Sequence, residues 1–227
     1  FVRLPAINVE QGVYLLADEV SFEEATFIEP LACVIRAQRV ARMKPGFCVL
    51  VVGSGIAGLL HIHLAKVMGA RIIVATDVVD YRLKQAKRFG ADKIFLAQDY
   101  TPEDLRRINE GRLADLVIIC TGAVDDINQA LESVERAGTA LFFAPTDKDA
   151  TLPLSINKLF WRNERTFVSS YAGSPKDHRE ALELIRSKKV AIKDMITHRL
   201  SLSDTLLGFK LVSEAKESIK VIIYPQK

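Results

Sequence analysis

Short runs of consecutive apolar residues alternate along this chain with longer stretches in which apolar residues recur every three or four positions. A continuous apolar run is typical of a strand that is buried on both faces of a parallel sheet, and the wider spacing is typical of an amphipathic helix. We expect strands over residues 48–52, 71–76, 94–96, 115–120 and 139–144. Their alternation with helices predicts an α/β fold built on a doubly wound parallel sheet, which binds its ligand at the carboxyl ends of the strands.

Local start and stop signals mark the helices between these strands. Thr101 followed by Pro102 and two acidic residues is typical of a helix N-terminus and predicts a helix over 102–110. Gly90 is typical of a helix C-terminus and closes a helix that we expect Asp80 to cap. Further helices are expected from Pro30 to just before Pro45 and over residues 59–68, 125–136, 176–188 and 203–215.

The first 28 residues do not follow this alternation. They hold two short strand-like pieces, Phe1–Leu4 and Val13–Leu16, and then Ser21 and Glu24 at the spacing of a capping box, which predicts a short helix. Two strands this short do not form a stable sheet alone. The chain also begins without a methionine, so we expect a fragment whose first residues belong to a partner sheet outside it.

The later part of the chain also departs from the regular alternation of strands and helices. An edge strand is expected over 166–170, and the helices that follow it alternate with strands over 196–200 and 219–224. No glycine-rich linker separates this tail from the segments before it. We interpret the tail as a segment that returns to the same missing partner domain.

The strand over residues 48–52 ends in the pattern G-x-G-x-x-G, formed by Gly53, Gly55 and Gly58. In a dinucleotide-binding Rossmann fold, the first glycine makes the turn, the second lets the backbone approach the pyrophosphate, and the third lets helix and strand pack closely. The N–H groups at the start of the helix then face the phosphates. Because strand, turn and helix occur in this order, we predict a dinucleotide site, the alternative being a glycine-rich turn with only a structural role.

An acidic residue indicates which dinucleotide binds. Asp77 ends the second predicted strand, 24 residues after Gly53. A carboxylate there accepts hydrogen bonds from the ribose hydroxyls and repels the 2′-phosphate of NADP, so the sequence favours NAD. Arg82, five residues further on, is expected along the adenine or ribose, and neutralising a 2′-phosphate is its alternative role.

Composition limits the classes of partner. A formal net charge of +3 is too small to indicate nucleic-acid binding, and no basic run supports it. No apolar stretch is long enough to span a membrane. The three cysteines, Cys33, Cys48 and Cys120, lie far apart and form no disulfide framework, so we expect a cytoplasmic protein with packed thiols.

The histidines do not indicate a metal site. His61 and His63 are two residues apart on a predicted helix and project about 200° from one another, so they do not chelate one ion. His178 and His198 have no cysteine or histidine at ligand spacing. We therefore expect exposed or packed histidines, and no catalytic zinc held by this chain alone.

The order of several motifs resembles the medium-chain, zinc-dependent alcohol and polyol dehydrogenases, the group that contains sorbitol and threonine dehydrogenase. The resemblance covers essentially the whole chain but only the later part of such an enzyme. The matching segments, besides Val49–Gly58, are Phe27–Cys33, Lys44–Gly46, Leu64–Lys66 with Gly69–Ala70, Gly90–Asp92, Cys120–Gly122, Phe142–Pro145 and Ile196–Arg199.

This resemblance implies hydride transfer between an alcohol or polyol and NAD(H), assisted by zinc in the intact enzyme. It implies that backbone at the two strand ends Thr121–Gly122 and Ala144–Pro145 meets the nicotinamide, and that Lys220 lies near the pyrophosphate. Glu29 matches the family's glutamate beside, or ligating, the catalytic zinc; an acid that stabilises a helix N-terminus is the alternative. The predicted cofactor-binding residues are Gly53, Gly55, Ile56, Ala57, Gly58, Asp77, Arg82, Thr121, Gly122, Ala144, Pro145 and Lys220.

The family's zinc cysteine and Gly-His-Glu motif lie in an N-terminal barrel domain and do not occur in this sequence. We therefore expect residues 1–29 to be a remnant of that catalytic domain and residues 30–172 to be the dinucleotide-binding Rossmann domain. Residues 173–227 are expected to be a C-terminal segment that packs on the catalytic domain. The chain is then the incomplete and inactive cofactor part of an NAD-dependent, zinc-type enzyme.

Two classes of function stay open. The first is this dehydrogenase, acting on a small alcohol or polyol. The second is a non-catalytic nucleotide-binding module, or a zinc-independent quinone or enoyl reductase of the same superfamily. Related enzymes are dimers or tetramers, and an edge strand over 166–170 favours pairing across a two-fold axis, so we expect a homo-oligomer.

Overall fold

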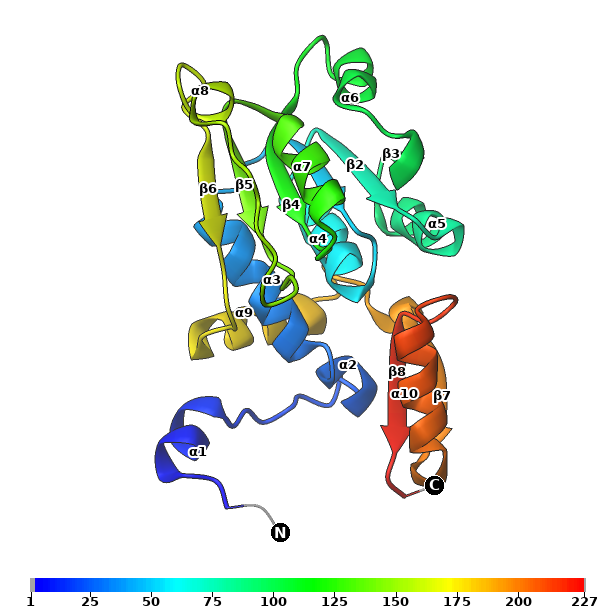
Figure 1. The fold of residues 1–227 in the computed structure, drawn as a ribbon. Coiled ribbons are helices and arrows are strands. Elements are labelled where there is room, and N and C mark those ends of the chain that lie inside the picture. The colour runs from blue at the N-terminus through cyan, green and yellow to red at the C-terminus, as the bar shows by residue number, and fades with distance from the viewer. Residues whose placement is uncertain (1–2, 227) are drawn as a thin grey trace.

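The computed structural model describes residues 3–226 of the chain. Its centre is a six-stranded parallel sheet in the order β3-β2-β1-β4-β5-β6 (Figure 1). The strands are β1 (Cys48–Val52), β2 (Ile72–Asp77), β3 (Lys93–Leu96), β4 (Ala114–Ile119), β5 (Val134–Phe142) and β6 (Thr166–Ser169). The predicted doubly wound parallel sheet is confirmed, and so is the position of β6 at its edge.

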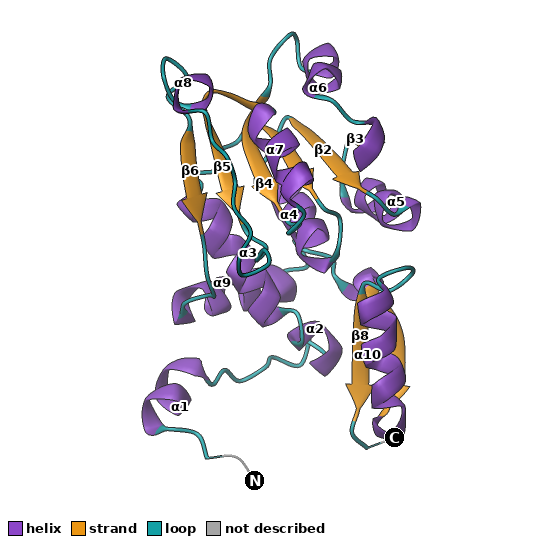
Figure 2. Cartoon of the chain, viewed as in Figure 1, coloured by secondary structure: helices purple, strands orange, loops and turns teal. Residues whose placement is uncertain are grey.

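Helices pack on both faces of this sheet (Figure 2). Alternate residues of a strand point to opposite faces, so Val49 and Val51 of β1 join one hydrophobic core while Leu50 joins the other. The first core is completed by α3 (Ile28–Val40), α4 (Ile56–Val67), α5 (Asp80–Phe89) and α9 (Pro175–Arg186), and the second by α6 (Pro102–Ile108) and α7 (Val124–Glu132). All five residues of β1 are buried, as a central parallel strand requires.

The tail forms a small unit of its own. Strands β7 (Ile196–Ser201) and β8 (Lys220–Tyr224) pair in parallel, separately from the main sheet, and α10 (Thr205–Glu214) packs against them (Figure 1). The helix α2 (Phe22–Ala25) bonds to this unit, because Glu23 accepts hydrogen bonds from Arg199 at 2.7 and 3.0 Å and from the Tyr224 hydroxyl. The segment before α3 and the tail therefore contact one another.

The strand predicted over Val13–Leu16 is wrong, and the described part of the strand predicted over Phe1–Leu4 is not a strand either. Phe1 and Val2 lie outside the described residues, and neither residues 3–4 nor residues 13–16 belong to a strand. Helix α1 (Ala6–Gly12) lies between them, and each of its residues is exposed. The predicted capping box of α2 is confirmed, with the Glu24 N–H donating to the Ser21 hydroxyl and the Ser21 N–H donating to the Glu24 carboxylate.

The helix predicted over 125–136 ends earlier than its apolar spacing indicates. The next residue, Ser133, donates from its hydroxyl to the carbonyl of Gln129, and Val134 already pairs with Ala114 of β4. Pairing in the sheet therefore overrides the helical spacing. The short helix α8 (Ile156–Leu159) was not predicted.

Helix α5 differs from its prediction only at its start. Val79 is the N-cap and Asp80 is the first helical residue, so the predicted cap is one position late. As predicted, Gly90 ends the helix, and its φ is +125°. Within residues 3–226, none of the helices has the length and apolar character needed to cross a membrane.

Candidate nucleotide-binding site

Three glycines shape the connection between β1 and α4. Gly53 has a φ of +92°, and a Cβ there would lie 2.9 Å from the carbonyl oxygen of Cys120. A Cβ on Gly58 would lie 1.9 Å from the carbonyl oxygen of Gly53, so helix and strand come this close only without a side chain. Gly55 differs, because no atom beyond its two chain neighbours lies within 4 Å of the place of its Cβ and its φ of −69° suits any residue. The packing of the described residues therefore does not require a glycine at position 55, and the backbone there is open to the approach of a ligand.

Helix α4 begins at this turn. Gly55 is the N-cap and has no side chain to bond the first N–H groups, and no acidic residue lies in the first turn. The N–H groups of Ile56, Ala57 and Gly58 therefore have no acceptor within the helix, and they carry the positive end of its dipole. Such a helix start is able to bind the phosphates of a dinucleotide.

Asp77 ends β2 beside the same turn, with only 4% of its side chain exposed. Its Oδ2 accepts a hydrogen bond from the Ser54 N–H at 2.7 Å, and its Oδ1 accepts one from the Val79 N–H at 2.9 Å. Each carboxylate oxygen has a further lone pair, so the fixed carboxylate is still able to accept from ribose hydroxyls. Arg82 lies in the first turn of α5 with its Nη1 3.9 Å from Asp77 Oδ2.

A cavity of about 140 Å³ joins these residues at the carboxyl ends of β1, β2 and β4. The strand order reverses between β1 and β4, and ligands of doubly wound sheets bind in the crevice at this point. The cavity brings together Gly53, Gly55, Asp77, Arg82 and Thr121, which were all predicted. Thr121 donates from its hydroxyl to Asp126 at 3.3 Å.

Six further lining residues of this cavity were not predicted: Val52, Thr76, Val78, Ala97, Cys120 and Asp126. Four of them are chain neighbours of predicted residues, but Ala97 and Asp126 lie after β3 and in α7, in segments that carry no motif of their own. Only the order of the strands brings them to one place, so a pattern local to each segment does not reveal them.

The predicted nicotinamide contacts lie at the ends of β4 and β5. Thr121 lines the cavity, whereas Gly122, Ala144 and Pro145 do not. A Cβ on Gly122 would lie 2.6 Å from the carbonyl oxygen of Pro145, so these two segments pack backbone against backbone. The Ala144 N–H donates to the carbonyl of Ile119 at 3.1 Å. The two strand ends are thus fixed against one another.

Lys220 and Glu29 do not line this cavity. The Lys220 ammonium donates to the Thr26 carbonyl at 3.1 Å and lies 5.0 Å from the centre of the Phe27 ring. Burial lowers the pKa of Lys220, and the nearby Glu29 carboxylate opposes that shift. Glu29 is exposed and accepts a bond from the Cys33 thiol at 3.2 Å.

Within residues 3–226, no group of three or more histidine, cysteine, aspartate or glutamate side chains is arranged to hold a metal ion. His61 is buried beside Gln38, at 3.2 Å between Nδ1 and Nε2, and burial lowers its pKa to about 3. Burial also raises the pKa of the Cys33 and Cys48 thiols to about 12, which disfavours the thiolate that a nucleophile or a zinc ligand requires. The described residues alone therefore do not fit a catalytic zinc.

Comparison with known proteins shows the same kind of fold and sequence. The family model for zinc-binding dehydrogenases matches residues 57–187, which is more than half of the chain. The D-xylulose reductase of Saccharomyces cerevisiae is 33% identical over 222 residues, which are 95% of this chain and 62% of that protein. The sorbitol dehydrogenase of Gallus gallus is 30% identical over 213 residues, which are 92% of this chain and 59% of that protein.

A solved structure agrees with these relatives. The 2R,3R-butanediol dehydrogenase from Bacillus subtilis superimposes with a TM-score of 0.84 at 26% identity, over 93% of this chain and 60% of that one. The chain thus spans less than two thirds of the length of each of these relatives.

Proposed function

This chain belongs to the zinc-binding dehydrogenase family, and from that premise we propose that it is the cofactor-binding part of an NAD-dependent oxidoreductase. In this proposal, the whole enzyme transfers a hydride between an alcohol or polyol carbon and the nicotinamide of NAD(H). The observation that carries the proposal is the buried Asp77 carboxylate, which two backbone N–H groups hold beside the glycine turn.

The proposed roles of the residues are to bind and orient the cofactor. The N–H groups at the start of α4, from Ile56 to Gly58, donate to the pyrophosphate. The Asp77 carboxylate accepts bonds from the ribose hydroxyls and repels a 2′-phosphate, so NAD binds better than NADP. Arg82 lies along the ribose or adenine, and the backbone at Gly122 and Pro145 faces the nicotinamide. The predicted approach of Lys220 to the pyrophosphate stays part of the proposal.

The class of substrate is proposed from the relatives. Two of them are named for polyols or their ketoses, sorbitol and D-xylulose, and the similar solved structure is named for a diol. A small polyol is therefore the substrate class that we propose for the whole enzyme. In the same proposal, the whole enzyme holds a zinc ion mainly through ligands outside residues 3–226, and Glu29 lies close to that zinc.

The division into domains is proposed from the contacts of the tail. Glu23 joins α2 to Arg199 and Tyr224 rather than to the main sheet. Helix α10 exposes Leu206, Phe209 and Val212, which are 85, 71 and 55% exposed. Apolar side chains gathered on one helix mark a contact surface. These observations support the assignment of α2 and of the tail from β7 onward to a catalytic domain, within the predicted segments 1–29 and 173–227, and of residues 30–172 to the cofactor domain. Helix α9 packs on α3 in the first core, so we place it with the cofactor domain.

A homo-oligomer is part of the same proposal. Strand β6 pairs only with β5 among the described strands, and an open edge of a sheet is able to pair with the same edge of a second copy. Sedimentation at micromolar concentration tests it, and a monomer would count against it. We also propose a cytoplasmic location, which the three free cysteines support.

The activity is tested on the whole enzyme of which we propose that this chain is a part. We expect NAD reduction with sorbitol or xylitol, followed by absorbance, loss of activity after treatment with a chelator, and its recovery with Zn²⁺. Reduction of quinones or enoyl compounds by NADPH, without polyol oxidation and without an effect of the chelator, would contradict the proposal in favour of a zinc-independent reductase.

A further inference from the structure

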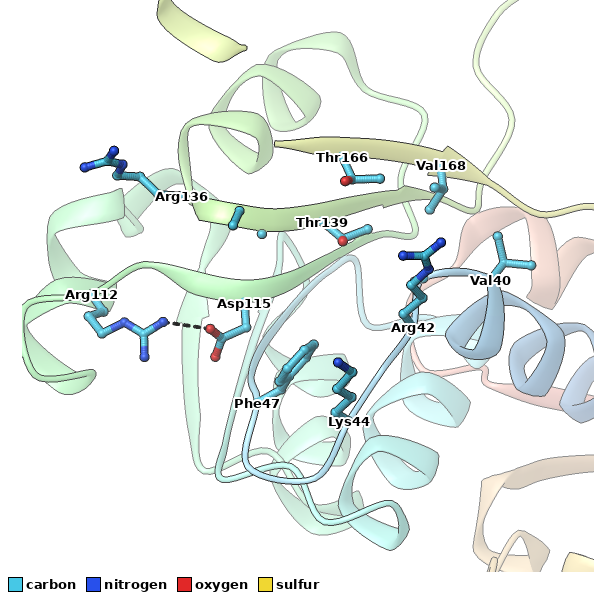
Figure 3. Close-up of a pocket in the computed structure, with 13 residues that line it drawn as sticks. Val40, Arg42, Lys44, Phe47, Arg112, Asp115, Arg136, Thr139, Thr166 and Val168 are labelled. Atoms are coloured by element: carbon cyan, nitrogen blue, oxygen red, sulfur yellow. Dashed lines mark hydrogen bonds and ion pairs between the residues drawn. The ribbon is translucent and has the colours of Figure 1, made fainter. Parts of the chain in front are cut away.

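The amino ends of the strands, opposite the nucleotide site, surround a larger cavity of about 550 Å³ (Figure 3). A volume of this size is ordinary for the binding site of a small molecule. The walls come from the connection between α3 and β1 and from the first residues of β4, β5 and β6. Its lining residues lie outside the proposed nucleotide site, and two of them, Thr166 and Val168, belong to the edge strand β6.

The lining of this cavity carries an excess of positive charge. Four basic side chains, Arg42, Lys44, Arg112 and Arg136, are among its lining residues, together with one carboxylate, Asp115. That carboxylate is already engaged, because it accepts from Arg112 at 2.9 Å and from the Cys48 N–H at 2.8 Å. It therefore does not neutralise the other cations.

Arg42 and Lys44 are the cations that remain for a ligand. Within residues 3–226, neither forms a salt bridge or a side-chain hydrogen bond. In Figure 3 both side chains extend from the α3–β1 connection toward Thr139, whereas Arg136 points away from them and donates to the Arg162 carbonyl. Two uncompensated cations that approach one space favour a divalent anion there.

The backbone that carries these two cations is fixed. The Met43 N–H donates to the carbonyl of Gln38 at 2.9 Å, and Arg42 takes the left-handed conformation that ends α3, with a φ of +55°. The Gly46 N–H donates to the carbonyl of Gly69 at 2.8 Å. The cations are thus presented by an ordered turn, which lowers the cost of ordering a site.

The remaining walls suit a particular kind of anion. The hydroxyls of Thr139 and Thr166 are able to donate to phosphate oxygens beside Arg42 (Figure 3). The Phe47 ring lies next to Lys44 and offers a flat apolar surface, the type of surface on which a planar group stacks. We propose that this cavity binds a small phosphate monoester, with its phosphate between Arg42 and Lys44 and its planar part against Phe47.

Calorimetric titration of the 227-residue chain with phenyl phosphate tests this site. We expect saturable binding that weakens as salt is raised, because the contacts are ionic and partly exposed. Inorganic phosphate, the second probe, should bind more weakly because it has no group to place against Phe47. Equal affinity for the two probes would overturn the phosphate monoester as the ligand.

Substitutions of the two cations test whether phenyl phosphate binds in this cavity. The double substitution R42Q/K44Q removes both cations and should lower the affinity for phenyl phosphate at least tenfold. The matched control K176Q/K189Q removes the same charge from two exposed lysines of α9 and the segment after it, and should leave the affinity within twofold. Lys44→Gln alone should lower it severalfold, which keeps the test valid if the double variant folds poorly.

The nucleotide site is the competing location for the probe. Because that site lies at the opposite end of the sheet, saturating NADH should leave phenyl phosphate binding unchanged, and R42Q/K44Q should leave NADH binding unchanged. Displacement of phenyl phosphate by NADH, unchanged affinity in R42Q/K44Q, or no saturable binding would each overturn the proposal. These outcomes do not depend on whether the chain prefers NAD.

Discussion

Gly55 and Gly58 lie three residues apart in one turn, yet the chain needs them for different reasons. The missing side chain of Gly58 serves the fold, because a Cβ would meet the Gly53 carbonyl at 1.9 Å. The missing side chain of Gly55 faces no atom of the described residues within 4 Å. Packing therefore explains Gly58, whereas for Gly55 we propose the approach of the nucleotide.

Alanine substitutions separate these two roles. Gly58→Ala should lower the free energy of unfolding by about 3 kcal/mol or more, since backbone has to move to admit the methyl group. Gly55→Ala should change it by less than about 1 kcal/mol, the range of N-cap substitutions, while lowering NADH affinity at least tenfold. Urea unfolding and NADH fluorescence measure the two effects. A folded Gly55→Ala variant with unchanged NADH affinity would contradict the role assigned to Gly55.

Single residues were predictable where their chemistry depends on near neighbours in the chain. The glycine spacing and the distance to Asp77 are properties of one strand–turn–helix–strand unit, and the structure places these residues around one cavity. Asp126 lines the same cavity, but its contact with Thr121 is set by the fold of the β4–α7 connection. Lys220 was predicted from family resemblance alone, and its place depends on how the tail packs against α2.

Among the elements, the short helix α2 depends on one carboxylate. Glu24 Oε2 accepts from the Ser21 N–H at 3.0 Å and from the Ser21 hydroxyl at 2.6 Å, and its Oε1 accepts from the Lys188 ammonium at 2.9 Å. Burial opposes the ionisation of Glu24, but these hydrogen bonds outweigh it and lower its pKa to about 2 from an ordinary value of 4.5. The carboxylate thus ties α2 to the end of α9.

This shift gives a pH dependence with a definite sign. Because the folded pKa lies below the unfolded one, the ionised Glu24 stabilises the fold above pH 4.5, and the contribution is lost as the pH falls toward 2. Its size is roughly 1–3 kcal/mol. Glu24→Gln should therefore lower the free energy of unfolding at pH 7, and the difference from the wild type should shrink across this window in urea titrations.

Glu10→Gln is the matched control for that measurement, since it makes the same change on an exposed residue of α1. It should leave the free energy of unfolding unchanged at each pH. A Glu24→Gln deficit that is the same at pH 7 and at pH 2.5 would show that the charge of Glu24 plays no part.

Elements were predictable where their signals are local. The capping box of α2 and the glycine that ends α5 were both predicted correctly, because each satisfies backbone groups within a few residues. The end of α7 was predicted too late, because Val134 pairs with Ala114, twenty positions earlier in the chain. The exposed helix α1 carries no amphipathic signal for a pattern to detect.

At the scale of the whole molecule, the parallel sheet separates two sets of groups. Its carboxyl ends present the glycine turn, the α4 N-terminus and Asp77, and its amino ends present Arg42 and Lys44. Apolar runs predicted the class of sheet because buried parallel strands require them. They did not reveal the larger basic cavity, whose walls come from four segments that are remote from one another in sequence.

The central proposal is that the Asp77 carboxylate makes this chain bind NAD in preference to NADP. Titration of the 227-residue chain with NADH and with NADPH, followed by nicotinamide fluorescence, tests it most directly. NADH should bind at least tenfold more tightly, a difference of about 1.4 kcal/mol, and Asp77→Ala should weaken NADH binding and reduce that preference. Equal affinity for the two cofactors, or tighter binding of NADPH, would contradict it.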